Sequence, residues 1–195
     1  MVTLASLPKT LAFRPPSEAR GGTIVWFTGL SGAGKSTIAN RVCADLLARG
    51  IRVEVLDGDV MRQHISRGLG FSREDRDENI RRIGFVADLL ARNGVVALVS
   101  AVSPYRAIRD EIRRSTQALF IEVYVSASLE CCERRDPKGL YRKARAGELA
   151  HFTGIDDPYE APIAAEVVCA TDEETIEASV DRVLQALLSR LAEKI

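Results

Sequence analysis

The chain has 195 residues, of which 46% are hydrophobic and 28% charged, a usual composition for a globular protein with one full core. Its 27 Lys and Arg residues balance its 27 Asp and Glu residues, so the composition gives no support for broad binding to nucleic acid or membranes. No apolar run approaches the roughly 20 residues of a membrane span. We expect residues 1–21, which lack the apolar core of a signal peptide, to form a flexible N-terminal arm before one domain over residues 22–195.

Cysteine and histidine usage gives no support for a zinc site. None of the four cysteines belongs to a C-x-x-C pair, two of them are adjacent, and the chain has only two histidines. We therefore expect buried or half-buried thiols in a reducing cytosol, and a cytoplasmic protein. The residues concerned are Cys43, Cys131, Cys132, Cys169, His64 and His151.

Strand-like apolar runs alternate with helix-like periodic segments along the chain. The expected strands cover residues 23–28, 52–57, 95–100, 120–125 and 166–169. The expected helices cover residues 36–49, 73–92, 105–114, 128–134 and 172–191. This alternation predicts an α/β fold, a three-layer sandwich in which a parallel five-stranded sheet has helices on both faces. Ligands should bind at the carboxyl ends of its strands.

Two of the expected helices begin with recognisable capping signals. Ser72 is followed by acidic residues in the first turn, which is typical of an N-cap. Residues 171–174 read T-D-E-E, a capping box in front of the apolar stripe of the last helix. We therefore expect that helix to begin at Asp172.

Residues 29–37 read G-L-S-G-A-G-K-S-T and contain the complete spacing G-x-x-x-x-G-K-[ST] of a P-loop. The motif lies between an expected strand and an expected helix, which is the context that a phosphate-binding loop needs. Backbone N–H groups and the helix N-terminus cradle phosphate oxygens there, while the Lys side chain reaches the β- and γ-phosphates. The residues expected to bind ATP are Gly32, Ala33, Gly34, Lys35, Ser36 and Thr37.

Two carboxylates follow the second expected strand, at Asp57 and Asp59. A phosphoryl acceptor needs a carboxylate that takes its proton or holds Mg²⁺, and the third strand ends without the usual Asp. We assign the catalytic role to Asp59, and expect Asp59 to hold Mg²⁺ together with the Ser36 hydroxyl. The alternative is that an Asp here only caps the following turn, the role we give to Asp57.

Residues 134–162 interrupt the regular pattern with a long stretch rich in charge, Gly and Pro. Such segments are often lids, and a basic lid would supply charge to a transferring phosphoryl group and exclude water. The alternative is a solvated helix face. The basic residues are Arg134, Arg135, Lys138, Arg142, Lys143 and Arg145.

Further blocks accompany the P-loop in order. They read L-D-G-D from Leu56, L-G-F-S-R-E-D-R-D-E-N-I-R-R-I-G from Leu69, S-P-Y-R from Ser103, R-D-P-K-G-L-Y-R-K-A-R-A-G-E from Arg135 and F-T-G-I-D-D-P-Y-E-A-P from Phe152. With these blocks the chain resembles the adenylylsulfate kinase (APS kinase) family over about residues 22–191. The resemblance implies a P-loop nucleoside-kinase-like fold and Mg²⁺-dependent transfer of the ATP γ-phosphate to the 3′-hydroxyl of adenosine 5′-phosphosulfate (APS). It also implies a homodimer and a functional association with ATP sulfurylase.

The resemblance also implies roles for individual residues. Phe71 and Phe152 would stack on opposite faces of the adenine, and two arginines would bind the phosphosulfate. Lys138 would act in catalysis beside Asp59 and Lys35, while Arg135 and Thr171 would lie near the ATP base. The implied APS pocket comprises Asp59, Arg62, Phe71, Arg76, Asn79, Val102, Ser103, Lys138 and Phe152.

Three positions depart from the family pattern. Val60 stands where the family usually has Asn, Ala150 where it has Lys, and His151 where it has Gly. These changes concern affinity and lid geometry more than the type of reaction. Two other functions stay open: a P-loop kinase for another small hydroxyl compound, and a nucleotide-binding regulatory domain. The acceptor-side residues argue against the first, and the intact Lys35, Ser36 and Asp59 argue against the second.

Overall fold

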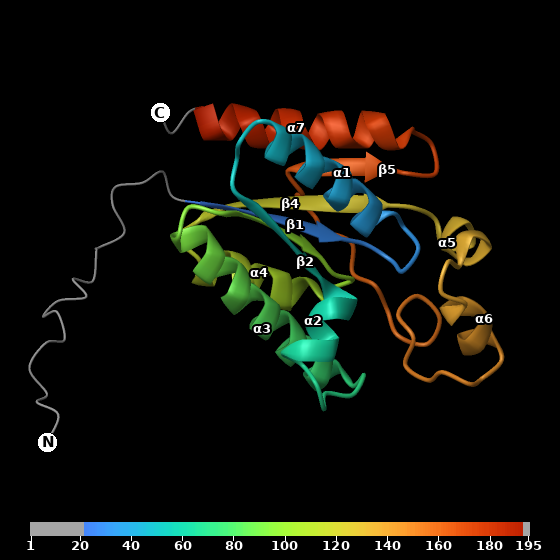
Figure 1. The fold of residues 1–195 in the computed structure, drawn as a ribbon. Coiled ribbons are helices and arrows are strands. Elements are labelled where there is room, and N and C mark those ends of the chain that lie inside the picture. The colour runs from blue at the N-terminus through green and yellow to red at the C-terminus, as the bar shows by residue number, and fades with distance from the viewer. Residues whose placement is uncertain (1–21, 193–195) are drawn as a thin grey trace, which may run out of the picture.

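A five-stranded parallel sheet forms the middle layer of the molecule (Figure 1). The computed structural model describes residues 22–192, and the expected N-terminal arm lies outside them. In sheet order the strands are β2 (Val53–Asp57), β3 (Val96–Ser100), β1 (Thr23–Thr28), β4 (Leu119–Ser126) and β5 (Val167–Ala170). Because every pairing is parallel, the carboxyl ends of the strands meet at one edge of the sheet.

Helices cover both faces of this sheet (Figure 1). They are α1 (Lys35–Ala48), α2 (Gly58–His64), α3 (Arg73–Arg92), α4 (Arg106–Ser115), α5 (Leu129–Arg135), α6 (Leu140–Arg145) and α7 (Ile176–Ala192). Side chains of β1 alternate between two cores. Val25 and Phe27 pack with α1 and α7, whereas Ile24 and Trp26 pack with α3 and α4. Among the described residues, no helix has the length and apolarity that crossing a bilayer requires.

The predicted fold class is confirmed, and the predicted strands and helices are all present with small shifts of their ends. Two short helices were not predicted. Helix α2 has only seven residues and begins at a glycine, and α6 follows Gly139, whose φ of 66° is left-handed. Segments this short carry too little hydrophobic periodicity for a sequence pattern to reveal them.

One predicted helix start is confirmed and the other is wrong. The Ser72 hydroxyl accepts a hydrogen bond from the Asp75 N–H, as expected of an N-cap. The last helix begins at Ile176 rather than at Asp172, because residues 171–174 form a turn on β5. The Asp172 carboxylate accepts the N–H of Ser128 instead, and Thr175 supplies the hydroxyl that bonds the Ala178 N–H.

The four cysteines are unpaired thiols, as predicted: Cys43 is half-buried, while Cys131, Cys132 and Cys169 are buried. Burial raises the pKa of the Cys169 thiol to about 11, so that thiol stays protonated at neutral pH. These side chains therefore belong to the packing of the core.

Candidate active site

A cavity of about 840 Å³ lies at the edge where the strands end. Its walls come from the P-loop, α2, the start of α3, the loop after β3 and residues 137–153 of the basic segment, the name used here for residues 134–162. All nine residues that the sequence analysis placed around an acceptor line this cavity. Five of the six predicted P-loop residues line it too. The fold therefore gathers two predicted sets, distant in the chain, around one space.

The P-loop turns sharply from β1 into α1, so that the N-terminus of the helix faces the cavity. Gly34 makes this turn with a left-handed φ of 105°, a conformation that favours glycine. Ala33 is the one predicted loop residue outside the cavity lining: its side chain is fully buried, and its N–H donates to the Leu30 carbonyl at 3.2 Å.

The Lys35 ammonium lies against the P-loop itself. Its Nζ donates to the carbonyl of Gly29 at 3.0 Å and to that of Leu30 at 2.7 Å, and only 8% of the residue is exposed. Burial lowers the pKa of Lys35 from 10.5 to about 8. An anion that replaces these carbonyls would stabilise the charged form of the side chain.

Three oxygen-bearing side chains meet beside the P-loop. The Ser36 hydroxyl donates to Asp57 Oδ2 at 2.7 Å and lies 3.0 Å from the Ser100 hydroxyl. Asp57 and Ser100 are neighbours because they are register partners at the ends of β2 and β3. Oxygen donors of this kind suit Mg²⁺, which binds through one or two carboxylates together with water and phosphate oxygens. The sequence analysis missed Asp57 and Ser100 as members of such a site.

Asp57 also caps α2 as predicted, since its Oδ1 accepts the N–H of Asp59 at 3.0 Å. Asp59 lies in the first turn of α2, with 63% of its side chain exposed. Its carboxylate forms an ion pair with Lys138 of the basic segment. The Ser36 hydroxyl donates to Asp57 and not to Asp59. The two carboxylates thus face different parts of the cavity, and this difference separates their possible roles.

Phe71 stands at the acceptor side of the cavity between helices α2 and α3, and 48% of it is exposed. The guanidinium carbons of Arg62 and Arg76 lie 4.5 Å and 5.6 Å from the ring centroid. Both arginines are also held by backbone: Arg62 donates to Gly70 at 2.7 Å and Arg76 to Phe71 at 3.0 Å. A planar ligand that stacks on this ring therefore competes with a guanidinium group.

Asn79 lies on α3 about one turn after Arg76, at the wall of the cavity, and is 6% exposed. Its Oδ1 is buried and has no hydrogen-bond partner. Buried acceptors are almost always bonded, so an unpaired one in a cavity wall indicates a place for a ligand donor.

The basic segment is partly a cavity wall and partly a solvated surface. Of its six basic residues only Lys138 lines the cavity. Arg145 pairs with Glu133 in α5, and Arg142 and Lys143 are exposed on α6. Phe152 lines the cavity beyond Lys138 and packs edge-on against Tyr141, with ring centroids 4.9 Å apart.

Arg135 and Thr171 lie against the P-loop but outside the cavity lining. Arg135 donates to the Gly32 carbonyl at 3.3 Å and to the Thr171 carbonyl at 2.5 Å. The Thr171 hydroxyl donates to the Ala33 carbonyl at 2.7 Å. These contacts tie the end of α5 and the turn after β5 to the loop.

The loop after β3 forms the wall opposite α2. Ser103 has a φ of 40°, and its buried hydroxyl accepts from Trp26 Nε1 at 3.0 Å and donates to Thr28 at 3.1 Å. Thr28 also donates to the Val102 carbonyl at 2.8 Å. Because its hydroxyl is occupied, we expect Ser103 to meet a ligand through its backbone.

Of the three unusual positions, His151 has the clearest structural consequence. It has a left-handed φ of 57°, its side chain is 68% exposed, and its Nδ1 lies 3.6 Å from Asp157 Oδ1. Its carbonyl accepts a hydrogen bond from Arg76. A positive φ is uncommon for any residue with a Cβ, although His tolerates it better than most, and glycine adopts it without strain. Ala150 lines the cavity, and Val60 is exposed on α2.

Comparison with known proteins identifies the family of the chain. The model of the adenylylsulphate kinase family matches residues 21–170. An adenylyl-sulfate kinase of Synechococcus sp. (strain JA-2-3B'a(2-13)) is 63% identical over 172 residues, 88% of this chain and 98% of the relative. A probable bifunctional SAT/APS kinase of Sorangium cellulosum is 58% identical over 166 residues, which are 85% of this chain and 28% of that protein.

A solved structure matches over the same region. The Mycobacterium tuberculosis APS kinase CysC, in complex with AMPPNP and APS, has a TM-score of 0.81 and 47% identity, and the match covers 85% of this chain and 97% of that one. The parallel α/β fold described above agrees with this structural similarity. The chain belongs to the adenylylsulphate kinase family.

Proposed function

We propose that this enzyme transfers the γ-phosphate of ATP to the 3′-hydroxyl of APS, giving 3′-phosphoadenosine 5′-phosphosulfate (PAPS) and ADP in sulfate activation. The observation that carries the proposal is the meeting of a complete P-loop and all nine acceptor-side residues around one cavity. The Mycobacterium tuberculosis relative was solved with AMPPNP and APS together, which supports the same pair of ligands here.

On the ATP side, the P-loop backbone and Lys35 would hold the phosphates, with Arg135 and Thr171 toward the base. Mg²⁺ would be held by Ser36 and Asp57, and when bound it would neutralise charge on the phosphates. The metal role that the sequence analysis gave to Asp59 is thereby assigned to Asp57. Asp59 keeps the acceptor role, in which its carboxylate orients or deprotonates the 3′-hydroxyl beside Lys138.

On the acceptor side, Phe71 and Phe152 would clamp the adenine, while Arg62 and Arg76 exchange their aromatic contacts for the phosphosulfate. The unpaired Oδ1 of Asn79 would accept a donor of the ligand. The basic segment would act as a lid, since Lys138 and Phe152 both come from it.

Removing both clamp rings should weaken APS binding selectively. In the double variant Phe71→Ala with Phe152→Ala, we expect the KM for APS to rise by about tenfold or more, because each base–aromatic stack contributes roughly 1–3 kcal/mol. The KM for ATP should change little. Steady-state kinetics with each substrate varied in turn measures both values, and equal increases in the two KM values would count against the clamp.

ATP affinity should fall as the pH rises above about 8, the lowered pKa of Lys35. Bound phosphates raise that pKa, so ATP binding takes up a proton, and affinity then falls by at most about tenfold per pH unit. Calorimetry in two buffers with different ionisation enthalpies measures the uptake. The matched control is Lys35→Arg, whose side chain stays charged and should take up none. The same uptake in both proteins would show that Lys35 is not its source.

The direct test of the proposed function is a product assay with purified protein, Mg-ATP and APS, followed by anion-exchange chromatography. We expect ADP and PAPS in equal amounts. ADP without PAPS would instead indicate another acceptor or hydrolysis, which is the alternative of a kinase for a different hydroxyl compound. Bound ATP without turnover would favour the regulatory domain.

We further propose a homodimer, association with an ATP sulfurylase, and a cytoplasmic location. Phe85 and Leu89 lie one turn apart on α3, and they are 65% and 45% exposed, which suits a surface covered by a second subunit. The Sorangium relative is named a probable bifunctional SAT/APS kinase, which supports the sulfurylase association. The unpaired thiols suit a reducing compartment.

A further inference from the structure

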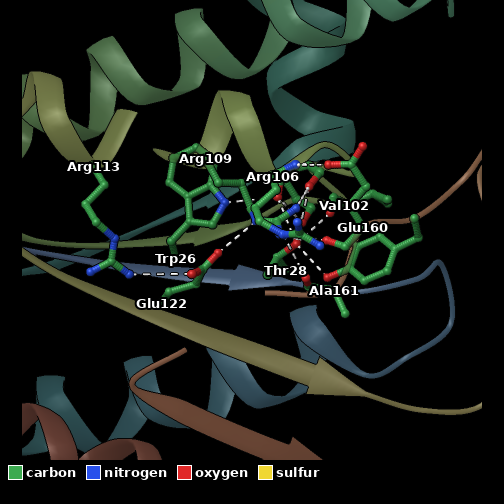
Figure 2. Close-up of polar contacts among 12 residues, drawn as sticks. Trp26, Thr28, Val102, Arg106, Arg109, Arg113, Glu122, Glu160 and Ala161 are labelled. Carbon is green, nitrogen blue, oxygen red and sulfur yellow. Dashed lines mark hydrogen bonds and ion pairs between the residues drawn. The ribbon is translucent and has the colours of Figure 1, made fainter. Parts of the chain in front are cut away.

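A cluster of charged side chains, of which Arg109 and Glu122 are buried and Arg113 and Glu166 half-buried, lies behind the acceptor wall, between α4 and the sheet (Figure 2). It contains Arg109 and Arg113 of α4, Glu122 of β4, and Glu166 just before β5. Arg109 is 1% exposed and Glu122 7%. Buried ion pairs are often no more stabilising than apolar residues of the same volume, so stability alone does not explain the cluster. The backbone groups that Arg109 binds suggest a role in positioning other segments.

The two arginines of the cluster have different partners. Arg113 forms a two-point pair with Glu166, at 2.6 Å and 2.9 Å, and lies 3.5 Å from Glu122. Arg109 uses three separate nitrogens: Nε donates to Glu122 at 2.8 Å, Nη1 to the Ser103 carbonyl at 2.6 Å and Nη2 to the Glu160 carbonyl at 2.7 Å. One guanidinium thus joins β4, the loop after β3 and the end of the basic segment.

The first of these carbonyls belongs to the strained part of the acceptor wall. Ser103 has a left-handed φ of 40°, a conformation that persists only where the surroundings enforce it. Trp26 and Thr28 hold its side chain, and Arg109 holds its carbonyl. Val102 and Ser103 line the cavity, so the geometry of that wall depends on this contact.

The second carbonyl belongs to Glu160, near the end of the basic segment. The Glu160 N–H donates to Pro104 at 2.8 Å, and the Glu160 carboxylate accepts the Arg106 N–H at 2.8 Å (Figure 2). The basic segment that ends here also carries Lys138 and Phe152. Arg109 therefore bonds at the same time to the Ser103 carbonyl in the cavity wall and to the Glu160 carbonyl near the end of the basic segment.

We propose that Arg109 is a positioning residue for the acceptor, which fixes the spacing between the Val102–Ser103 wall and the anchor of the basic segment at Glu160. The expected change in the kinetics for APS rests on the proposed function. The structural part of the proposal, the coupling of the two segments, applies to the ligand-free protein. Arg109 forms no hydrogen bond to the P-loop or to Lys35, so we expect the ATP side to change little.

The matched pair of variants is Arg109→Lys and Arg113→Lys. Both keep a positive charge opposite Glu122 and both lose a guanidinium from the same cluster, in which Arg109 is buried and Arg113 half-buried. An ammonium is a compact donor that cannot span three divergent acceptors as the planar guanidinium does. Only Arg109→Lys should therefore release Ser103 and Glu160, whereas Arg113→Lys tests the cost of disturbing the cluster itself.

We expect Arg109→Lys to lower kcat/KM for APS by about 10- to 100-fold, mainly through KM, with the KM for ATP within about threefold of wild type. Amide exchange of the ligand-free protein, followed by mass spectrometry, should become faster in residues 101–106 and 158–162 but not in α7. Arg113→Lys should change neither readout in this selective way. Equal effects of the two variants, or equal increases in both KM values, would overturn the proposal.

The exchange readout separates this inference from the proposed function. If the wild-type enzyme does not phosphorylate APS, the proposed function fails, and unchanged exchange in Arg109→Lys would still refute the coupling. If Arg109→Lys does not fold, Arg109→Met combined with Glu122→Gln removes the Arg109–Glu122 pair together. The double variant is compared with Glu122→Gln alone, in which Arg109 keeps both carbonyl contacts. Only the double variant should show faster exchange in residues 101–106 and 158–162.

Discussion

Replacing Asp59 with Asn should lower kcat about 10²- to 10⁴-fold while leaving the binding of ATP and APS within a few-fold of wild type. The substitution keeps the shape of the side chain and removes its ability to accept the proton of the 3′-hydroxyl. Asp59 suits this role because it is 63% exposed toward the cavity and does not share the Ser36 hydroxyl. The measurement is the initial rate of ADP and PAPS formation at saturating substrates, together with calorimetric binding.

The control for Asp59 is Lys138→Gln, because the two side chains form an ion pair. If Asp59 acted only by holding Lys138, the two variants would lose activity equally. A larger loss in Asp59→Asn assigns the proton-accepting role to the carboxylate. Turnover of Asp59→Asn close to that of wild type would remove Asp59 from the mechanism.

Replacing Asp57 with Asn should lower kcat/KM for Mg-ATP about 10²- to 10³-fold and raise the Mg²⁺ concentration needed for half-maximal rate. The physical reason is the loss of a charged oxygen ligand beside Ser36, whose hydroxyl donates to Asp57 at 2.7 Å. Asparagine also caps helices well, so the contact that starts α2 is preserved. The measurement is a titration of Mg²⁺ at fixed ATP and APS.

Asp59→Asn serves as the comparison in that titration. If the assignment is right, Asp57→Asn shifts the Mg²⁺ dependence and Asp59→Asn lowers the rate without shifting it. The opposite pattern would return the metal role to Asp59. A thermal unfolding midpoint near that of wild type shows in either case that the cap on α2 is intact.

The sequence predicted what depends on local pattern. A glycine-rich loop between a strand and a helix has one common geometry, so the P-loop followed from residues 23–49, and the parallel strands followed from the alternation of strand-like and helix-like segments along the chain. The resemblance supplied the acceptor residues, and the structure brings all nine to one cavity.

What the sequence could not predict depends on contacts between distant segments. The neighbours Asp57 and Ser100 meet through the register of β2 and β3, which no local pattern specifies. Arg109 lies within the helix predicted over residues 105–114, but no local pattern indicates that it is 1% exposed and bound by Glu122 and two backbone carbonyls. The T-D-E-E sequence at 171–174 resembled a capping box, but Asp172 bonds to Ser128 and the helix starts later.

The distribution of charge around the cavity has a consequence for the timing of the catalytic cycle. The whole chain is neutral, yet the ionisable groups that line the cavity include Lys35, Arg62, Arg76 and Lys138 against only Asp57 and Asp59. A local excess of positive charge attracts polyanions over roughly the Debye length of 8 Å and speeds their encounter with the enzyme. We expect the same field to retain PAPS, which carries one phosphate more than APS, so that fast capture of substrate would be coupled to slow departure of product.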